Sequence, residues 1–223
     1  MGKTNTEESQ KLARESTDCS FLLTHLIRQN DDKTEADAQN ILDLILDIHN
    51  SQPNPLLKSS RTGWYSSASA KYFSAETCQL NNAGAYNSVC FTESTLSGLK
   101  AHRDMFGAKY GLSFNREFLL SKGAAPCINI PHNIFKKEVI YKNDSYPRKV
   151  FNFIPKELHP YINLMSESFD ASHEREWRHH YDMEFSWSDI RFIFCPESDF
   201  ETFSKIQING LPTLFDLTWL DRV

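Results

Sequence analysis

The stretch KYGLSFNREFLLSKGAAPCINI, residues 109–130, predicts a strand, a short helix and a second strand in close succession. Tyr110, Leu112 and Phe114 alternate with smaller or polar residues, which is the period of a strand with one buried face. The helix is expected to end at Gly123, because glycine adopts the left-handed conformation that commonly follows a helix. Short strands interrupted by short helices favour an α+β fold.

Further strands and helices are expected on both sides of this stretch. TEADAQNILDLILDIHN (34–50) predicts the clearest helix, capped by Thr34 and carrying an apolar stripe at helical spacing. The remaining segments have weaker patterns: a strand or short helix over 18–29, loops with short strands over 51–85, a strand over 86–92, a helix over 95–106 with Leu96, Leu99 and Met105 on its apolar side, a strand pair formed by 139–141 and 148–154, short helical pieces over 155–169, a strand over 189–196 and a helix over 197–207.

These elements do not alternate regularly between strand and helix, which argues against a doubly wound α/β fold. We therefore expect a flexible N-terminal tail over residues 1–17 and a single α+β domain over residues 18–223. The domain should contain mixed, mostly antiparallel sheets with flanking helices.

Composition limits the classes of function. The chain has 223 residues, is 40% hydrophobic and carries a formal net charge of −5, so it can bury a core and should not bind nucleic acid through overall charge. Its five cysteines are odd in number and form no CxxC pair, which is typical of reduced thiols in a cytoplasmic protein. The sequence has no signal peptide and no membrane-spanning run. It also lacks the motifs of P-loop, Rossmann, zinc-protease and α/β-hydrolase enzymes.

The segment HEREWRHH (173–180) gathers charged and titratable residues around one Trp. It has three interpretations. The first is a solvated face with ion pairs between neighbours, including a structural pair of Glu174 or Glu176 with Arg178 or Arg116. The second is a metal site with ligands from His173, Glu174, Glu176, His179, His180 and Asp182.

The third interpretation is a catalytic strand. Alternation would then direct Glu174, Glu176 and Arg178 to one face of a sheet and Trp177 to the other. Two carboxylates about 7 Å apart along a strand could stabilise a cationic transition state, and their mutual repulsion would separate their pKa values. Cleavage of a glycosidic bond to a positively charged leaving group requires such an arrangement.

Four segments resemble a known family: HLIR (25–28), VCFTE (89–93), YGLSFNREFLLSKGAAPCINI (110–130) and HEREWR (173–178). In this order they resemble the AbiGi-type abortive phage-resistance proteins, which look distantly similar to the DarT-type and wider ADP-ribosyltransferase fold. The resemblance covers roughly residues 20–195 and implies NAD as the substrate. A clear Ser-Thr-Ser strand is missing, and AbiGi-type proteins are commonly labelled antitoxins.

The resemblance implies a role for each of five residues. Glu176 would be the catalytic glutamate that holds the nicotinamide ribose, and Glu174 would position or activate the acceptor. His25 would bind the ribose of NAD and Arg28 would lie near the adenosine or pyrophosphate. Tyr110 could stack on nicotinamide.

Three hypotheses of function follow. The first is a bacterial anti-phage defence protein that transfers ADP-ribose from NAD to a macromolecule or cleaves NAD; overall charge does not indicate a nucleic-acid acceptor. The second is a non-catalytic antitoxin or sensor that binds a partner toxin or a phage component. The third is a metal-dependent nuclease or hydrolase that uses the His and Glu residues of 173–180.

Overall fold

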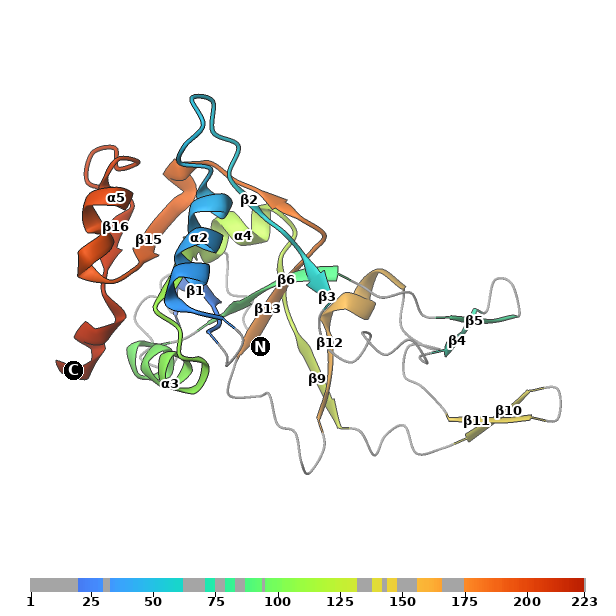
Figure 1. The fold of residues 1–223 in the computed structure, drawn as a ribbon. Coiled ribbons are helices and arrows are strands. Elements are labelled where there is room, and N and C mark those ends of the chain that lie inside the picture. The colour runs from blue at the N-terminus through green and yellow to red at the C-terminus, as the bar shows by residue number, and fades with distance from the viewer. Residues whose placement is uncertain are drawn as a thin grey trace, which may run out of the picture.

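An eight-stranded sheet forms the centre of the computed structural model (Figure 1). The structure describes residues 20–29, 33–61, 71–74, 79–82, 87–93, 95–131, 138–141, 144–147, 156–165 and 175–222. The expected N-terminal tail and Glu174 lie outside these residues.

The main sheet is almost entirely antiparallel, as expected for the α+β class. Its order is β16-β15-β7-β1-β6-β13-β8, with β3 also paired to β6, and only β15 and β16 run parallel. The strands are β1 (Leu22–Ile27), β3 (Ser60–Arg61), β6 (Asn87–Thr92), β7 (Tyr110–Asn115), β8 (Ala125–Pro126), β13 (Glu176–His180), β15 (Ile190–Phe194) and β16 (Thr213–Phe215).

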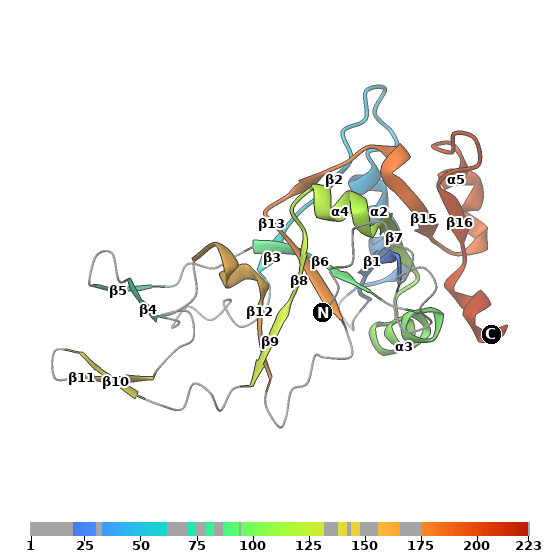
Figure 2. The same cartoon turned by 180° about the vertical axis from the view of Figure 1, so that it is seen from behind.

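Four two-stranded sheets complete the described strands. The pairs are β2 (Leu56–Leu57) with β14 (Met183–Glu184), β4 (Lys71–Ser74) with β5 (Gln79–Asn82), β9 (Ile128–Pro131) with β12 (Ile162–Met165), and β10 (Glu138–Tyr141) with β11 (Asp144–Pro147). The β4–β5 and β10–β11 hairpins extend away from the main sheet on the same side (Figures 1 and 2).

Two expectations for this region need correction. The strand β10 pairs with β11 across a tight connection, so 144–147 is the partner of 139–141 and the expected partner 148–154 lies outside the described residues. Residues 156–161 form a 3₁₀ helix, η4 (Lys156–Tyr161), but the chain then continues as β12, which pairs in parallel with β9. A strand of four residues is too short to show a period of its own. Its partner β9 is also distant in sequence, so no local pattern indicates the pairing.

Helices cover both faces of the main sheet. They are α2 (Glu35–Leu46), α3 (Leu96–Phe106), α4 (Arg116–Ser121), α5 (Phe200–Ser204) and the 3₁₀ helices η6 (Trp187–Asp189), η7 (Glu197–Asp199) and η8 (Leu217–Arg222). Thr34 caps α2 as expected, in a reciprocal capping box with Asp37. The helix expected over 197–207 is shorter and consists of η7 followed by α5.

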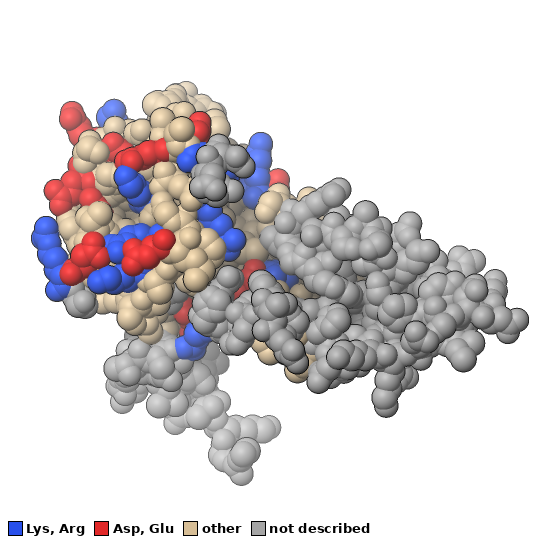
Figure 3. Space-filling model, turned by 60° about the horizontal axis from the view of Figure 1, so that its bottom comes forward, with Lys and Arg blue, Asp and Glu red and all other residues tan. Residues whose placement is uncertain are grey.

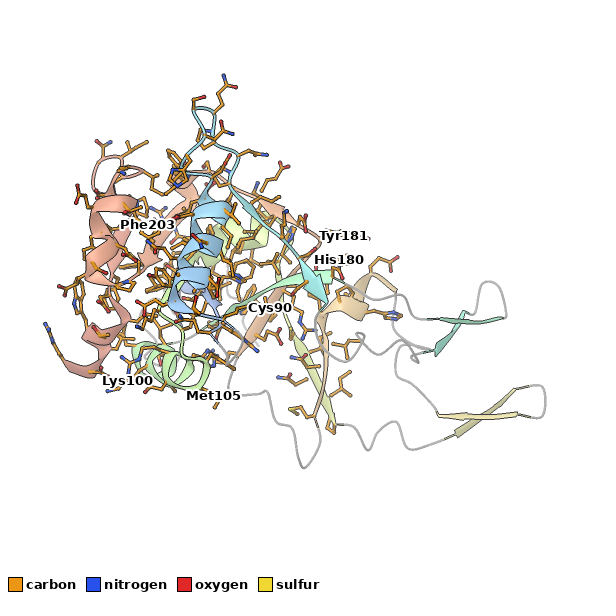
Figure 4. All side chains as sticks on the ribbon, viewed as in Figure 1. Cys90, Lys100, Met105, His180, Tyr181 and Phe203 are labelled. Atoms are coloured by element: carbon orange, nitrogen blue, oxygen red, sulfur yellow. The ribbon has the colours of Figure 1, made fainter. Side chains whose placement is uncertain are left out.

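The larger core lies on one face of the sheet, here called the core face. It contains Leu23 of β1, Phe91 of β6, Leu112 of β7 and Trp177 of β13, packed under α2 and α5. Figure 4 shows Phe203 of α5 in this packing. Tyr110, Leu112 and Phe114 all belong to this core, so the alternation expected in β7 is confirmed.

The opposite face, here called the Glu176 face, is apolar at one end and polar at the other. Register sets Ser113, Thr24, Thr92 and Glu176 in one row across β7, β1, β6 and β13. Beyond this row, a second core forms between the sheet, α3 and η8 from Leu99, Phe194, Leu217 and Leu220. The sheet therefore separates a mostly apolar face, which also carries His25 and Glu93, from a face that carries Glu176 and Arg178 of β13.

The apolar side expected for α3 is wrong. Leu99 is buried, but Leu96 and Met105 are 56% and 66% exposed, and the helix instead buries His102, three residues after Leu99 (Figure 4). At 3.6 residues per turn, residues spaced by three drift around the helix, so Leu96 and Met105 fall on opposite sides of the narrow face that Leu99 and His102 bury. Within the described part of the chain, no helix has the length and apolar content needed to span a membrane.

Candidate active site around Glu176

The strand β13 begins at Glu176, so the alternation of side chains that was expected from Glu174 onward can hold only from Glu176. Arg175 has a left-handed backbone with φ of 44°, which interrupts extended geometry immediately before the strand. From Glu176 onward the alternation holds: Glu176 and Arg178 pair with each other, while Trp177 enters the larger core. Extended geometry therefore does not run from Glu174 to Glu176 without interruption.

Glu176 and Arg178 form a buried bidentate ion pair. The Nε atom of Arg178 donates to Oε1 of Glu176 and its Nη2 atom donates to Oε2, both at 2.9 Å. The two side chains are 10% and 2% exposed. Parallel hydrogen bonds from a guanidinium fix both the position and the plane of a carboxylate. The structural ion pair considered for HEREWRHH is thus present.

Asn163 of β12 joins this pair from a separate sheet. Its Nδ2 atom donates to Oε2 of Glu176 at 2.8 Å, and its Oδ1 atom accepts from Nη2 of Arg178. The Nη1 atom of Arg178 donates to the carbonyls of Pro160 and Ile162 at 2.8 and 3.3 Å. The guanidinium thereby ties η4 and β12 to the main sheet.

Two thiols complete the surroundings of the carboxylate. Cys90 (labelled in Figure 4) lies opposite Arg178 on β6, and Cys127 follows β8 on the other side of β13, where its backbone N–H donates to the carbonyl of Glu176 at 2.8 Å. Burial, together with the neighbouring charge of Glu176, raises the pKa of the Cys90 thiol to about 12. Cys90 therefore carries a neutral thiol that can act as a donor. In the described part of the chain, Cys90, Cys127 and Cys195 are free of disulfides.

The carboxylate of Glu176 is ionised despite its burial. Burial favours the protonated form, but the charge of Arg178 and the hydrogen bonds from Arg178, Cys90 and Asn163 outweigh it, so the pKa of Glu176 is below its ordinary value. An ionised, oriented carboxylate in a dry environment is suited to stabilise positive charge.

His25 approaches the same region from β1. Only Thr24 and Thr92 form a bridge between β1 and β6, and the Nδ1 atom of His25 contacts the carbonyl of Cys90 at 2.8 Å. A carbonyl only accepts, so Nδ1 carries the proton and Nε2 the lone pair of the neutral ring. Burial lowers the pKa of His25, and the charge of Arg28 lowers it further, although the bond to Cys90 acts in the opposite sense. Register pairs His25 with Leu112 and its ring packs against Phe91, so His25 lies on the core face and Glu176 on the opposite face, with β6 between them.

Arg28 and Tyr110 do not join this cluster. Arg28 is exposed, and its guanidinium carbon lies 4.0 Å from the ring centre of Phe106. Tyr110 is 1% exposed within the larger core, and its hydroxyl donates to Asp199 at 2.6 Å. A ring buried in this way has no open face for nicotinamide, so the hypothesis of stacking by Tyr110 lacks geometric support.

A second buried carboxylate, Glu93, lies at the end of β6. It accepts from the Trp177 indole at 3.0 Å and from Arg175 at 3.3 Å, and Arg116 lies 3.6 Å away. Register sets Glu93 and Trp177 on the core face, opposite to Glu176. Glu93 therefore contacts the first residues of β13 from the core face. Arg116 pairs with Glu93 rather than with Glu176.

The metal interpretation finds no support in the described residues, where no group of three or more His, Cys, Asp or Glu side chains could hold an ion. His180 contacts the carbonyl of Asn87 at 2.9 Å, and Asp182 accepts two hydrogen bonds from Ser59. A cleft of about 350 Å³ lies nearby, lined by Leu56, Lys122, His179, Asp182, Met183 and Glu184. None of the four described residues predicted for NAD lines it.

Sequence reasoning missed Cys90 and Asn163. Cys90 stands within the quoted VCFTE segment, but a Cys in an apolar strand usually indicates packing alone. Asn163 lies in a stretch expected to be helical, and no local pattern links it to Glu176. Searches of family models, curated proteins and solved structures each returned no match to this chain.

Proposed function

We propose that this chain is a bacterial defence protein that cleaves NAD and transfers ADP-ribose to an acceptor. The single observation that supports this function best is the buried carboxylate of Glu176, which Arg178 and Asn163 orient and keep ionised on β13. An ionised, oriented carboxylate suits the developing positive charge of a ribose. The resemblance of the HLIR and HEREWR segments to AbiGi-type proteins supports the same conclusion.

The proposed reaction breaks the bond between C1′ of the ribose and the nicotinamide nitrogen. The bonding electron pair leaves with nicotinamide, which becomes neutral, and the ribose becomes an oxocarbenium ion that Glu176 stabilises. An acceptor nucleophile then attacks C1′ and loses its proton. The resemblance assigns His25 to a ribose hydroxyl, from which Nε2 would accept a hydrogen bond, and Arg28, the residue after β1, to the pyrophosphate. It assigns Glu174 to activation of the acceptor.

A nucleic-acid acceptor would need a local basic surface. On the face shown in Figure 3, the described Lys and Arg side chains lie among Asp and Glu side chains. Arg103 pairs with Asp221 at 2.8 Å, and Lys109 pairs with Glu35. This mixture of charge favours a protein acceptor or water over the phosphate backbone.

Release of nicotinamide by the purified protein tests this function. Wild type should release it, and Glu176→Gln should lower kcat by about 10²-fold or more, because the amide cannot neutralise the oxocarbenium ion. Glu184→Gln changes an exposed glutamate on β14 and serves as the matched control, with activity unchanged.

Because Glu176→Gln also disturbs a buried ion pair, a second variant is needed. His25→Ala leaves the pair of Glu176 and Arg178 in place and should lower kcat/KM with little change in the melting temperature. No release by folded wild-type protein, with NAD and candidate protein acceptors present, would rule out the reaction.

A non-catalytic antitoxin or sensor is the second candidate function. One observation favours it: the carboxylate of Glu176 has about four acceptor positions, and Arg178 and Asn163 already fill three of them. In that case Glu176 serves to hold β12 on the sheet. The protein would then be harmless when expressed alone and would rescue cells from its partner toxin.

A further inference from the structure

Asn163 hydrogen bonds to both members of the buried ion pair from outside β13. It is 5% exposed, and it bonds to Glu176 through Nδ2 and to Arg178 through Oδ1. The three side chains therefore form a closed ring of hydrogen bonds, in which the amide is a donor on one side and an acceptor on the other.

We propose that Asn163 is a positioning residue for Glu176 in the proposed NAD cleavage, on which this inference rests. An amide is the side chain of this size that can satisfy both neighbours at once. Aspartate would accept from Arg178 but could not donate to Glu176, and alanine would do neither. The amide thereby holds Oε2 of Glu176 in place and helps to keep the carboxylate ionised.

The position of Asn163 in the fold gives this contact a second consequence. Asn163 belongs to β12, which pairs with β9 and not with the main sheet. Together with the carbonyls of Pro160 and Ile162, it seats η4 and β12 on Arg178. The orientation of Glu176 therefore depends on a strand from a different sheet being in contact with β13.

The test compares Asn163→Ala and Asn163→Asp with Asn129→Asp. Asn129 is exposed on β9 and stands directly opposite Asn163, so its variant adds the same charge at a solvent-exposed neighbour of Asn163. Nicotinamide release is measured against pH, and the melting temperature is measured at about pH 5 and about pH 7.5.

Both variants of Asn163 should lower kcat by about 10-fold to 100-fold with little change in KM, because the carboxylate is misplaced after the substrate has bound. In Asn163→Asp the new carboxylate raises the pKa of Glu176, so the acid limb of the rate profile moves up by about one pH unit. A carboxyl whose folded-state pKa is raised is favoured when protonated, so the loss of melting temperature should be larger at the higher pH. Asn129→Asp should change neither profile.

Release by wild type with an unmoved acid limb in Asn163→Asp would overturn this inference and leave the proposed function standing. An equal shift of the acid limb in Asn129→Asp would also overturn this inference and leave the proposed function standing. Absence of release by wild type overturns the proposed function, and the positioning role falls with it.

Discussion

Glu176 and Arg178 stand two residues apart on one strand, and extended geometry alone brings their side chains to the same face. Alternation along β13 predicted this shared face, and the paired contacts at 2.9 Å confirm it. Asn163 could not be predicted, because it precedes Glu176 by 13 residues and reaches it through the pairing of β12 with β9. The residues on one strand were thus accessible to sequence reasoning, whereas their partner from another sheet was not.

The buried pair should dominate the stability of this region. Removing one member leaves the other charge buried and unpaired, so Glu176→Leu and Arg178→Met should each lower the free energy of unfolding by about 3–5 kcal/mol. The double variant Glu176→Leu with Arg178→Met removes both charges and should lose less than the sum of the single variants. Urea denaturation measures all three. Losses that simply add would mean that the two side chains do not interact.

The same pair predicts a pH dependence. The pKa of Glu176 is lowered in the folded state, so its contribution to stability is present above the pKa of the unfolded chain and is lost as the pH falls through the folded-state value. Wild type should therefore lose more stability on acidification than Glu176→Ala. Equal losses would show that Glu176 titrates normally in the fold.

At the scale of elements, strands with a clear alternation were predicted correctly. Residues 109–115 and 86–92 form β7 and β6, and the strand expected over 189–196 is β15. Periodicity failed to choose between strand and helix over 18–29, where the chain forms β1. The choice is made by pairing, because β1 lies between β6 and β7 and bonds to both. Long-range contacts therefore decide what local preference leaves open.

Gly111 of β7 allows β1 to approach closely at His25. A Cβ atom at this position would lie 2.6 Å from the carbonyl oxygen of His25 and 2.9 Å from a methyl group of Leu26. Gly111→Ala should therefore displace β1 and lower the free energy of unfolding by about 1–3 kcal/mol. It should also reduce nicotinamide release more than this stability loss explains, because His25 moves. Unchanged urea unfolding would contradict the tight packing of β1 on β7.

At the scale of the whole molecule, the core face of the sheet is mostly apolar, whereas the Glu176 face is apolar at one end and polar at the other. Helices α2 and α5 close the core face, and α3 with η8 closes only the apolar end of the Glu176 face (Figures 1 and 2). The row from Ser113 to Glu176 remains polar across four strands. The sequence predicted the mixture of antiparallel strands and helices, but the strand order that brings β1 and β13 to either side of β6 depends on pairings far apart in the chain.

The central claim is that this chain binds NAD and that His25 contributes to this binding. The most direct measurement is a calorimetric titration with carba-NAD, in which a methylene replaces the ring oxygen of the nicotinamide ribose and prevents cleavage. Wild type and Glu184→Gln should bind it with equal affinity, and His25→Ala should bind about tenfold more weakly because one hydrogen bond is lost. No binding to folded wild type, or equal affinity in His25→Ala, would contradict the claim.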